Sequence, residues 1–195
     1  MKISIIMAVF NEEKFLDKTL RAITEQTLKP NQIIVVDDGS TDKSPEIIAK
    51  YPVTVKRLSI KKDKSLERYP MVLSIGSTLI QDDFDYVGIL DADTLIEPDY
   101  YQKLTRWMSE DKTIGIAGGQ LIGEQEEKSF GLMPYVYGAN RLYSRKCWLK
   151  LNGGKMMKPY VVDQIENPDT KTVVQKTEPE VVGEPISETI IRERR

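Results

Sequence analysis

Residues 3–13 read ISIIMAVFNEE, a nearly continuous apolar run, interrupted at Ser4, that ends in the polar, acidic residues Asn11-Glu12-Glu13. A strand that is apolar on both faces is typical of a parallel sheet covered by helices on both sides. We therefore expect Ile3–Val9 to form a buried strand with polar residues at its carboxyl end. The run is short and lacks a small-residue cleavage site, so it does not fit a secretory signal peptide.

The same pattern recurs along the chain, alternating with stretches of helical periodicity. We expect further strands at Gln32–Asp37, Val53–Leu58, Tyr86–Leu90 and Ile114–Ala117. We expect helices after an N-cap at Asn11, from Ser44-Pro45, from Pro70 to Ile80, at Pro98–Met108 and at Ser144–Leu151. Strand and helix in alternation predict an α/β sandwich with a mostly parallel central sheet. After residue 118 the alternation weakens, and we expect one domain over residues 1–195.

The amino-acid composition of the chain excludes several kinds of catalytic and binding site. The chain has 195 residues and no histidine, which removes the commonest general base and the commonest zinc ligand. Its single cysteine cannot form an internal disulfide. A net charge of −2 gives no basic excess for nucleic acid, and no apolar stretch is long enough for a transmembrane helix. Acid–base work and metal binding therefore depend mainly on Asp and Glu.

Polar clusters follow the expected strands at three points. These clusters are Asn11-Glu12, Asp37-Asp38 and Asp91-Ala92-Asp93. Ligands of open parallel α/β sheets bind at the carboxyl ends of the strands, so this placement predicts a cleft for a polar ligand. Asp and Asn are also common turn and cap residues, and for any one cluster that alternative stays open.

The cluster at Asp91 and Asp93 is the strongest of these. If the chain stays extended past the strand, both carboxylates point to the same side. Mg²⁺ and Mn²⁺ prefer one or two carboxylates together with phosphate oxygens of a ligand. An Asp-x-Asp after a buried strand therefore suggests a metal-bridged diphosphate.

Three motifs in order resemble family 2 glycosyltransferases: Ser4–Glu12 (SIIMAVFNE), Ile34–Asp42 (IVVDDGSTD) and Leu90–Asp93 (LDAD). The resemblance covers residues 3–120 well and continues more faintly to about residue 190. It implies a GT-A fold, a nucleotide-diphosphate-sugar donor, a divalent metal (Mn²⁺ or Mg²⁺) and inversion of the anomeric centre. It also implies a nucleotide-sugar-binding half over residues 1–120 and an acceptor-side half over residues 121–195.

Individual roles also follow from the resemblance. The residues expected to contact the nucleotide are Ala8, Glu12, Asp38, Arg68 and Asp91. Asp93 would coordinate the metal on the diphosphate, and Asp163 would be the catalytic base. The acceptor would be a polysaccharide or a lipid-linked glycan, as in cell-envelope polysaccharide biosynthesis, and the expected location is cytoplasmic.

The C-terminal third departs from the family pattern. The helix expected after Asp163 is cut short at Pro168, and no C-terminal histidine can assist the metal. A nucleotide-sugar-binding domain without transferase activity is therefore an alternative. A phosphatase of the haloacid dehalogenase type, with Asp91 as its nucleophile, is a more distant one. Ile190-Ile191 lies among arginines, which suggests a solvated tail or a peripheral contact with a membrane surface.

Overall fold

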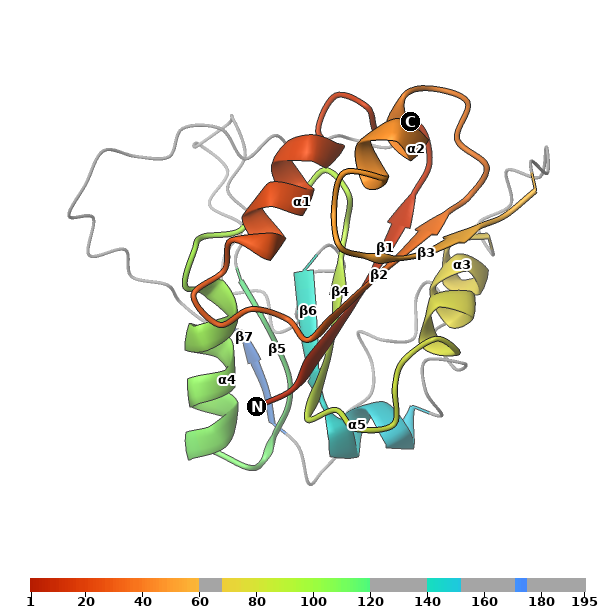
Figure 1. Cartoon of the computed structure of the whole chain (residues 1–195). Coiled ribbons are helices and arrows are strands. Elements are labelled where there is room, and N and C mark those ends of the chain that lie inside the picture. Colours follow the sequence, from red (N-terminus) through yellow and green to blue (C-terminus); the bar gives the residue numbers. More distant parts are fainter. Residues whose placement is uncertain (60–67, 120–139, 152–170, 175–195) are drawn as a thin grey trace, which may run out of the picture.

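A sheet of seven strands organises the computed structural model, which describes residues 1–59, 68–119, 140–151 and 171–174. The strands lie in the order β3-β2-β1-β4-β6-β5-β7 (Figure 1). Their bounds are β1 (Ile3–Val9), β2 (Gln32–Asp37), β3 (Thr54–Arg57), β4 (Tyr86–Leu90), β5 (Ile114–Gly118), β6 (Asn140–Ser144) and β7 (Lys171–Val174). Asp163 and the C-terminal Ile190-Ile191 lie outside the described residues.

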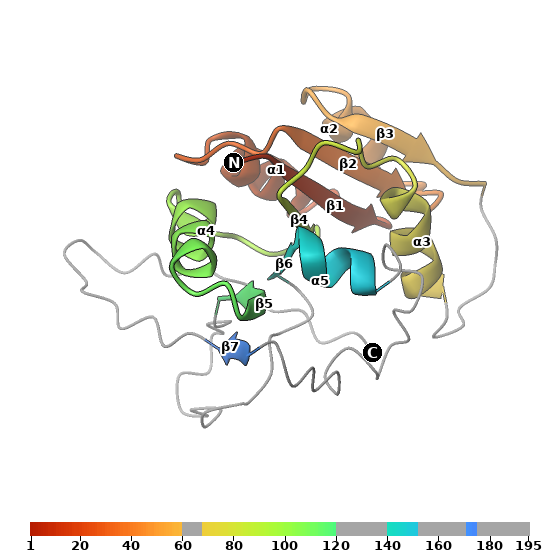
Figure 2. The ribbon, with the colours of Figure 1, turned by 90° about the horizontal axis from the view of Figure 1, so that it is seen from below.

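Helices cover both faces of this sheet. They are α1 (Leu16–Thr24), α2 (Ser44–Ile48), α3 (Arg68–Ser77), α4 (Tyr100–Glu110) and α5 (Arg145–Lys150). The first, second and fourth helices pack on one face, and α3 and α5 pack on the other (Figure 2). This three-layer arrangement confirms the expected α/β sandwich.

All strands but one run in the same direction. β1, β2, β3 and β4 are joined by parallel pairings, and β5 pairs in parallel with β7. β6 is antiparallel to both of its neighbours, β4 and β5. The carboxyl ends of β1, β2, β4 and β5 therefore meet the amino end of β6 at one edge of the sheet, called the carboxyl edge below.

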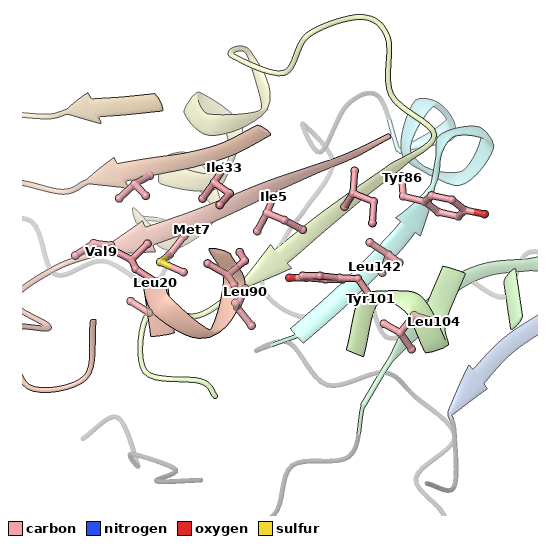
Figure 3. Close-up of a cluster of buried hydrophobic side chains, with 14 of the residues drawn as sticks. Ile5, Met7, Val9, Leu20, Ile33, Tyr86, Leu90, Tyr101, Leu104 and Leu142 are labelled. Carbon is pink, nitrogen blue, oxygen red and sulfur yellow. The ribbon is translucent and has the colours of Figure 1, made fainter. Parts of the chain in front are cut away.

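The larger core cluster lies between the sheet and helices α1 and α4. Figure 3 shows side chains of β1, β4 and β6 pointing toward both helices, among them Ile5, Leu90 and Leu142. These side chains are at most 1% exposed. On the other face, α3 approaches β1 closely at Gly76, where an added Cβ would lie 2.5 Å from Cγ2 of Ile6.

The expected strands and helices are present, and several of them have shifted ends. The strand expected at Val53–Leu58 is the shorter β3, an edge strand whose residues are all exposed. The helix expected from Pro70 begins at Arg68, because proline is tolerated in the first turn of a helix.

The N-cap expected at Asn11 is wrong. Asn11 has a left-handed backbone (φ 55°), and its Oδ1 accepts a hydrogen bond from the backbone N–H of Thr41. Helix α1 begins only at Leu16, with Phe15 at the N-cap position. The side chain that suggested a cap for α1 instead links the loops after β1 and β2.

No helix within the described part of the chain is both long and apolar enough to span a membrane.

Candidate functional site

Asp38 and Arg68 form a paired acid and base at the carboxyl edge. Asp38 directly follows β2, and its backbone N–H donates to the carbonyl of Val9 at the end of β1. Nε and Nη2 of Arg68 each lie 2.5 Å from a different carboxylate oxygen of Asp38. Both side chains are largely buried, at 14% and 12% exposed, so the bidentate pair is well shielded from solvent.

The next residue of α3 extends this pair to a second acid. The hydroxyl of Tyr69 donates a hydrogen bond to Oδ1 of Asp91, which follows β4. The first turn of α3 thus contacts acids that follow two strands lying on either side of β1. Asp38, Arg68, Tyr69 and Asp91 form one polar cluster, called the α3 cluster below.

Asp93 lies beside this cluster on a turn. The backbone N–H of Thr94 donates to the carbonyl of Asp91, which closes a turn over Ala92 and Asp93. The extended conformation on which the sequence argument depended is therefore wrong. Ala92 packs into the larger core cluster, which pulls the chain inward between the two acids.

The residues at this edge suit a divalent cation only in part. Asp93 is half-buried, and its carboxylate makes no hydrogen bond or ion pair with the described residues. It is therefore available as a hard oxygen ligand. Within the described ranges, no three Asp, Glu, Cys or His side chains gather closely enough to hold a metal. A cation here would need oxygens from a bound ligand as well.

Ala8 and Phe10 lie at the end of β1, between the strands that carry the two acids. Ala8 pairs with Val36 of β2 and packs on the α3 face of the sheet. Phe10 directly follows β1, and its side chain is 55% exposed. Neither Tyr69 nor Phe10 was predicted from sequence. Their only signals were an aromatic next to Arg68 and an aromatic next to the Asn11-Glu12 corner.

Glu12 belongs to a second polar group, in which the loops after β1 and β2 are hydrogen-bonded together. The backbone N–H of Glu12 donates to Oγ of Ser44, and that of Glu13 donates to Asp42. In return, the backbone N–H of Lys43 donates to the carboxylate of Glu13. These bonds tie the start of α1 to the start of α2.

Other candidates from the sequence have structural roles. Asp37 is 1% exposed, accepts a hydrogen bond from the backbone N–H of Ser40 and forms an ion pair with Arg57. Cys147 is half-buried in α5, where burial raises the pKa of its thiol, consistent with packing rather than reactivity. A hollow of about 370 Å³ lies beside α2, away from the α3 cluster. It is lined by Glu13, Lys14, Lys43, Glu46, Ile47 and Lys50.

Comparison with known sequences identifies the family. The family described as "Glycosyl transferase family 2" matches residues 4–162 of the chain. Glycosyltransferase GlyA of Streptococcus pneumoniae serotype 4 is 35% identical over 103 residues, which is 53% of this chain. The match covers only 14% of GlyA, so the chain spans much less than that relative's full length.

Solved structures agree on the fold. S. aureus TarS (residues 1–349), in complex with UDP-GlcNAc, superposes with a TM-score of 0.61 at 20% identity over 78% of this chain and 47% of TarS. The mannosyltransferase PcManGT of Pyrobaculum calidifontis, in complex with GDP-Man and Mn²⁺, gives a TM-score of 0.61 at 18% identity over 78% of this chain and 47% of its own. The expected GT-A fold is confirmed. Because the family match covers most of its length, the chain belongs to glycosyl transferase family 2.

Proposed function

We propose that this chain carries the donor-binding and catalytic region of a metal-dependent inverting glycosyltransferase. The enzyme moves a sugar from a nucleotide-diphosphate sugar to a hydroxyl of a polysaccharide or lipid-linked glycan. The observation that carries the proposal is the α3 cluster, which gathers Asp38, Arg68 and Asp91 beside Asp93 at the carboxyl edge. That edge is where open parallel sheets bind nucleotides.

The nucleotide would bind across the end of β1. Arg68 keeps N–H donors that Asp38 does not use, and Asp38 keeps acceptor positions, so the pair offers a donor next to an acceptor. The edge of a nucleobase carries an acceptor next to a donor, and these two groups could pair with Arg68 and Asp38. Ala8 would let the base approach the strand end, and Phe10 offers an exposed ring beside it. Glu12 would line the same pocket from the loop after β1.

The diphosphate would lie at the acids that follow β4. Asp91, held by the hydroxyl of Tyr69, would accept a hydrogen bond from the ribose. Asp93 would hold Mn²⁺ or Mg²⁺ together with oxygens of the diphosphate. When bound, the cation would neutralise the charge that develops on the departing nucleotide diphosphate. Asp163 would take the proton of the acceptor hydroxyl as the new C–O bond forms.

Binding and turnover separate this proposal from its alternatives. Calorimetric titrations with UDP-, GDP- and dTDP-sugars, each with and without Mn²⁺, come first, followed by a donor-hydrolysis assay. We expect metal-dependent binding of one nucleotide class, and release of its sugar. Binding without any turnover would favour a binding domain, and no binding at all would overturn the proposal. The phosphatase alternative is disfavoured by the family match.

Matched variants test whether the nucleotide sugar binds at the proposed site. Asp91→Asn should weaken nucleotide-sugar binding, because it removes the carboxylate that Tyr69 holds at the carboxyl edge. Asp82→Asn is the control, since Asp82 is exposed and precedes the amino end of β4, at the opposite edge of the sheet. Equal binding by the two variants would remove Asp91 from the site.

A further inference from the structure

Asn140, the first residue of β6, carries a buried polar atom that the proposed mechanism does not use. The residue is 5% exposed, and its Oδ1 has no hydrogen-bond partner among the described residues. Buried polar atoms almost always have a partner, and a buried acceptor without one destabilises the folded state. A carboxamide kept in this condition is a candidate contact for a ligand.

The position of Asn140 connects it to the acids after β4. In the β4–β6 pairing, Asn140 lies directly opposite Leu90, the residue before Asp91. Residues opposite one another in an antiparallel pair have Cα atoms about 4.5–5.5 Å apart and side chains on the same face. Asn140 therefore stands at the carboxyl edge on the α4 face of the sheet, whereas Tyr69 contacts Asp91 from the α3 face.

Helix α4 fixes the backbone of Asn140 in place. The hydroxyl of Tyr100 donates to the carbonyl of Asn140 and accepts from the backbone N–H of Gly119, both at 2.9 Å. Burial raises the pKa of Tyr100 far above its usual value, so its hydroxyl keeps the proton that it donates. An added Cβ at Gly119 would lie 2.9 Å from the Tyr100 ring and 3.5 Å from Nδ2 of Asn140, so a larger residue there would displace the Tyr100 ring.

We propose that Asn140 is a specificity-determining residue whose Oδ1 accepts a hydrogen bond from a hydroxyl of the donor sugar. The proposal rests on the function proposed above. A sugar hydroxyl can donate to Oδ1, whereas diphosphate oxygens are acceptors only and cannot. The sugar is attached to the diphosphate, so a diphosphate at Asp91 and Asp93 brings it to the first residue of the neighbouring strand. Tyr100 is the positioning residue, because it holds the backbone from which the carboxamide extends.

The test compares the affinity for the nucleotide with the affinity for the whole donor. Wild type, Asn140→Ala and the surface control Gln102→Ala are titrated with Mn²⁺ plus UDP or GDP, and with Mn²⁺ plus UDP-glucose, UDP-N-acetylglucosamine or GDP-mannose. We expect Asn140→Ala to bind Mn²⁺–UDP or Mn²⁺–GDP within about twofold of wild type. It should bind the matching nucleotide sugar about 3- to 10-fold more weakly, the range of a single hydrogen bond. Deoxy analogues of that sugar then identify the hydroxyl, because the analogue that lacks it should bind wild type more weakly but bind Asn140→Ala as well as the complete sugar nucleotide does.

Each contrary result has a separate meaning. Equal sugar binding by wild type and Asn140→Ala overturns the role of Asn140 and leaves the proposed function intact. An equal loss for nucleotide and nucleotide sugar also overturns it, by placing the carboxamide at the metal or the diphosphate. If wild type binds no nucleotide sugar, the proposed function fails and this inference fails with it.

Thermal unfolding provides a second readout. Removing an acceptor that lacks a partner should leave the Tm of Asn140→Ala unchanged or raised, as expected where a residue serves binding at the expense of stability. A marked fall in Tm would assign Asn140 a structural role and overturn the proposal. Asn140→Ser, which is smaller than asparagine but remains polar, repeats the titrations if the alanine variant does not fold.

Discussion

At the scale of single residues, Asp93 is the acid at the carboxyl edge that is most available to bind a ligand. Its carboxylate has no partner in the described part of the chain, whereas Asp37 and Asp38 are engaged by arginines. We expect Asp93→Asn to lower sugar transfer about 100-fold or more, because a catalytic cation supplies several kcal/mol and each 1.36 kcal/mol is tenfold in rate.

Initial rates over a Mn²⁺ titration measure this effect. The control is again Asp82→Asn, an exposed acid at the opposite edge of the sheet. If Asp93→Asn reached the wild-type rate at the same Mn²⁺ concentration, Asp93 would not be the metal ligand.

For the proposed base, Asp163, the affinity for the nucleotide sugar and the rate of sugar transfer must be measured separately. Asp163→Asn keeps the size of the side chain but cannot accept a proton, so we expect nucleotide-sugar affinity to be unchanged and transfer to fall on the order of 10²–10⁴-fold. Single-turnover transfer and calorimetry on the same preparation check both halves. Asp169→Asn, six positions further on, is the control. Full transfer by the Asp163 variant would move the base elsewhere.

At the scale of elements, the packing of α3 on β1 decides where the α3 cluster lies. Gly76 permits the close approach, since an added Cβ would lie 2.5 Å from Ile6 and 3.2 Å from Val36. We expect Gly76→Ala to lower the free energy of unfolding by about 1–2 kcal/mol. Overpacking costs ~1–3 kcal/mol, of which the higher helix propensity of alanine recovers a little under 1 kcal/mol.

Urea unfolding monitored by circular dichroism checks this packing. Ser74→Ala, in the same helix but only partly buried, changes propensity without adding atoms to the interface, and should lose no stability. A stabilised Gly76→Ala protein would mean that α3 can move away from β1 at little cost.

The sequence predicted strands with a continuous apolar pattern better than a strand with a mixed one. Gln32–Asp37 and Tyr86–Leu90 were predicted with the bounds that the structure shows, because a strand apolar on both faces has a strong pattern. β6 was not predicted at all. Its sequence, NRLYS, mixes polar and apolar residues, and its place in the sheet depends on pairing with β4, far away in sequence. The candidate site shows the same limit. Tyr69 and Asn140 are recognised as site residues only because the fold brings them next to β4, which lies elsewhere in the sequence.

At the scale of the whole molecule, the absence of histidine shapes metal affinity. Among the residues that the structure describes, no three metal-binding side chains gather, so we expect the bound diphosphate and water to supply most of the ligands of a cation. We expect Mn²⁺ to bind the free protein at least tenfold more weakly than the protein saturated with nucleoside diphosphate. By linkage, Mn²⁺ must strengthen nucleotide binding by the same factor.

Paired titrations of both ligands check the two factors against each other. Mg²⁺ serves as the comparison ion, and Ca²⁺ as a cation of different size and coordination preference. Tight Mn²⁺ binding by the free protein would indicate further ligands from this chain and would contradict the expectation.

The antiparallel β6 has a consequence for how the chain assembles during synthesis. β5 pairs only with β6 and β7 among the described strands, and both are made after it. A nascent chain whose β5 has just left the ribosome therefore carries a strand with two unpaired edges, packed against α4 but not yet part of the sheet. β5 reaches the rest of the sheet only through β6, so it can join only once Asn140–Ser144 has been made and pairs with β4. The corner where Asn140 stands would thus be among the last parts of the carboxyl edge to form.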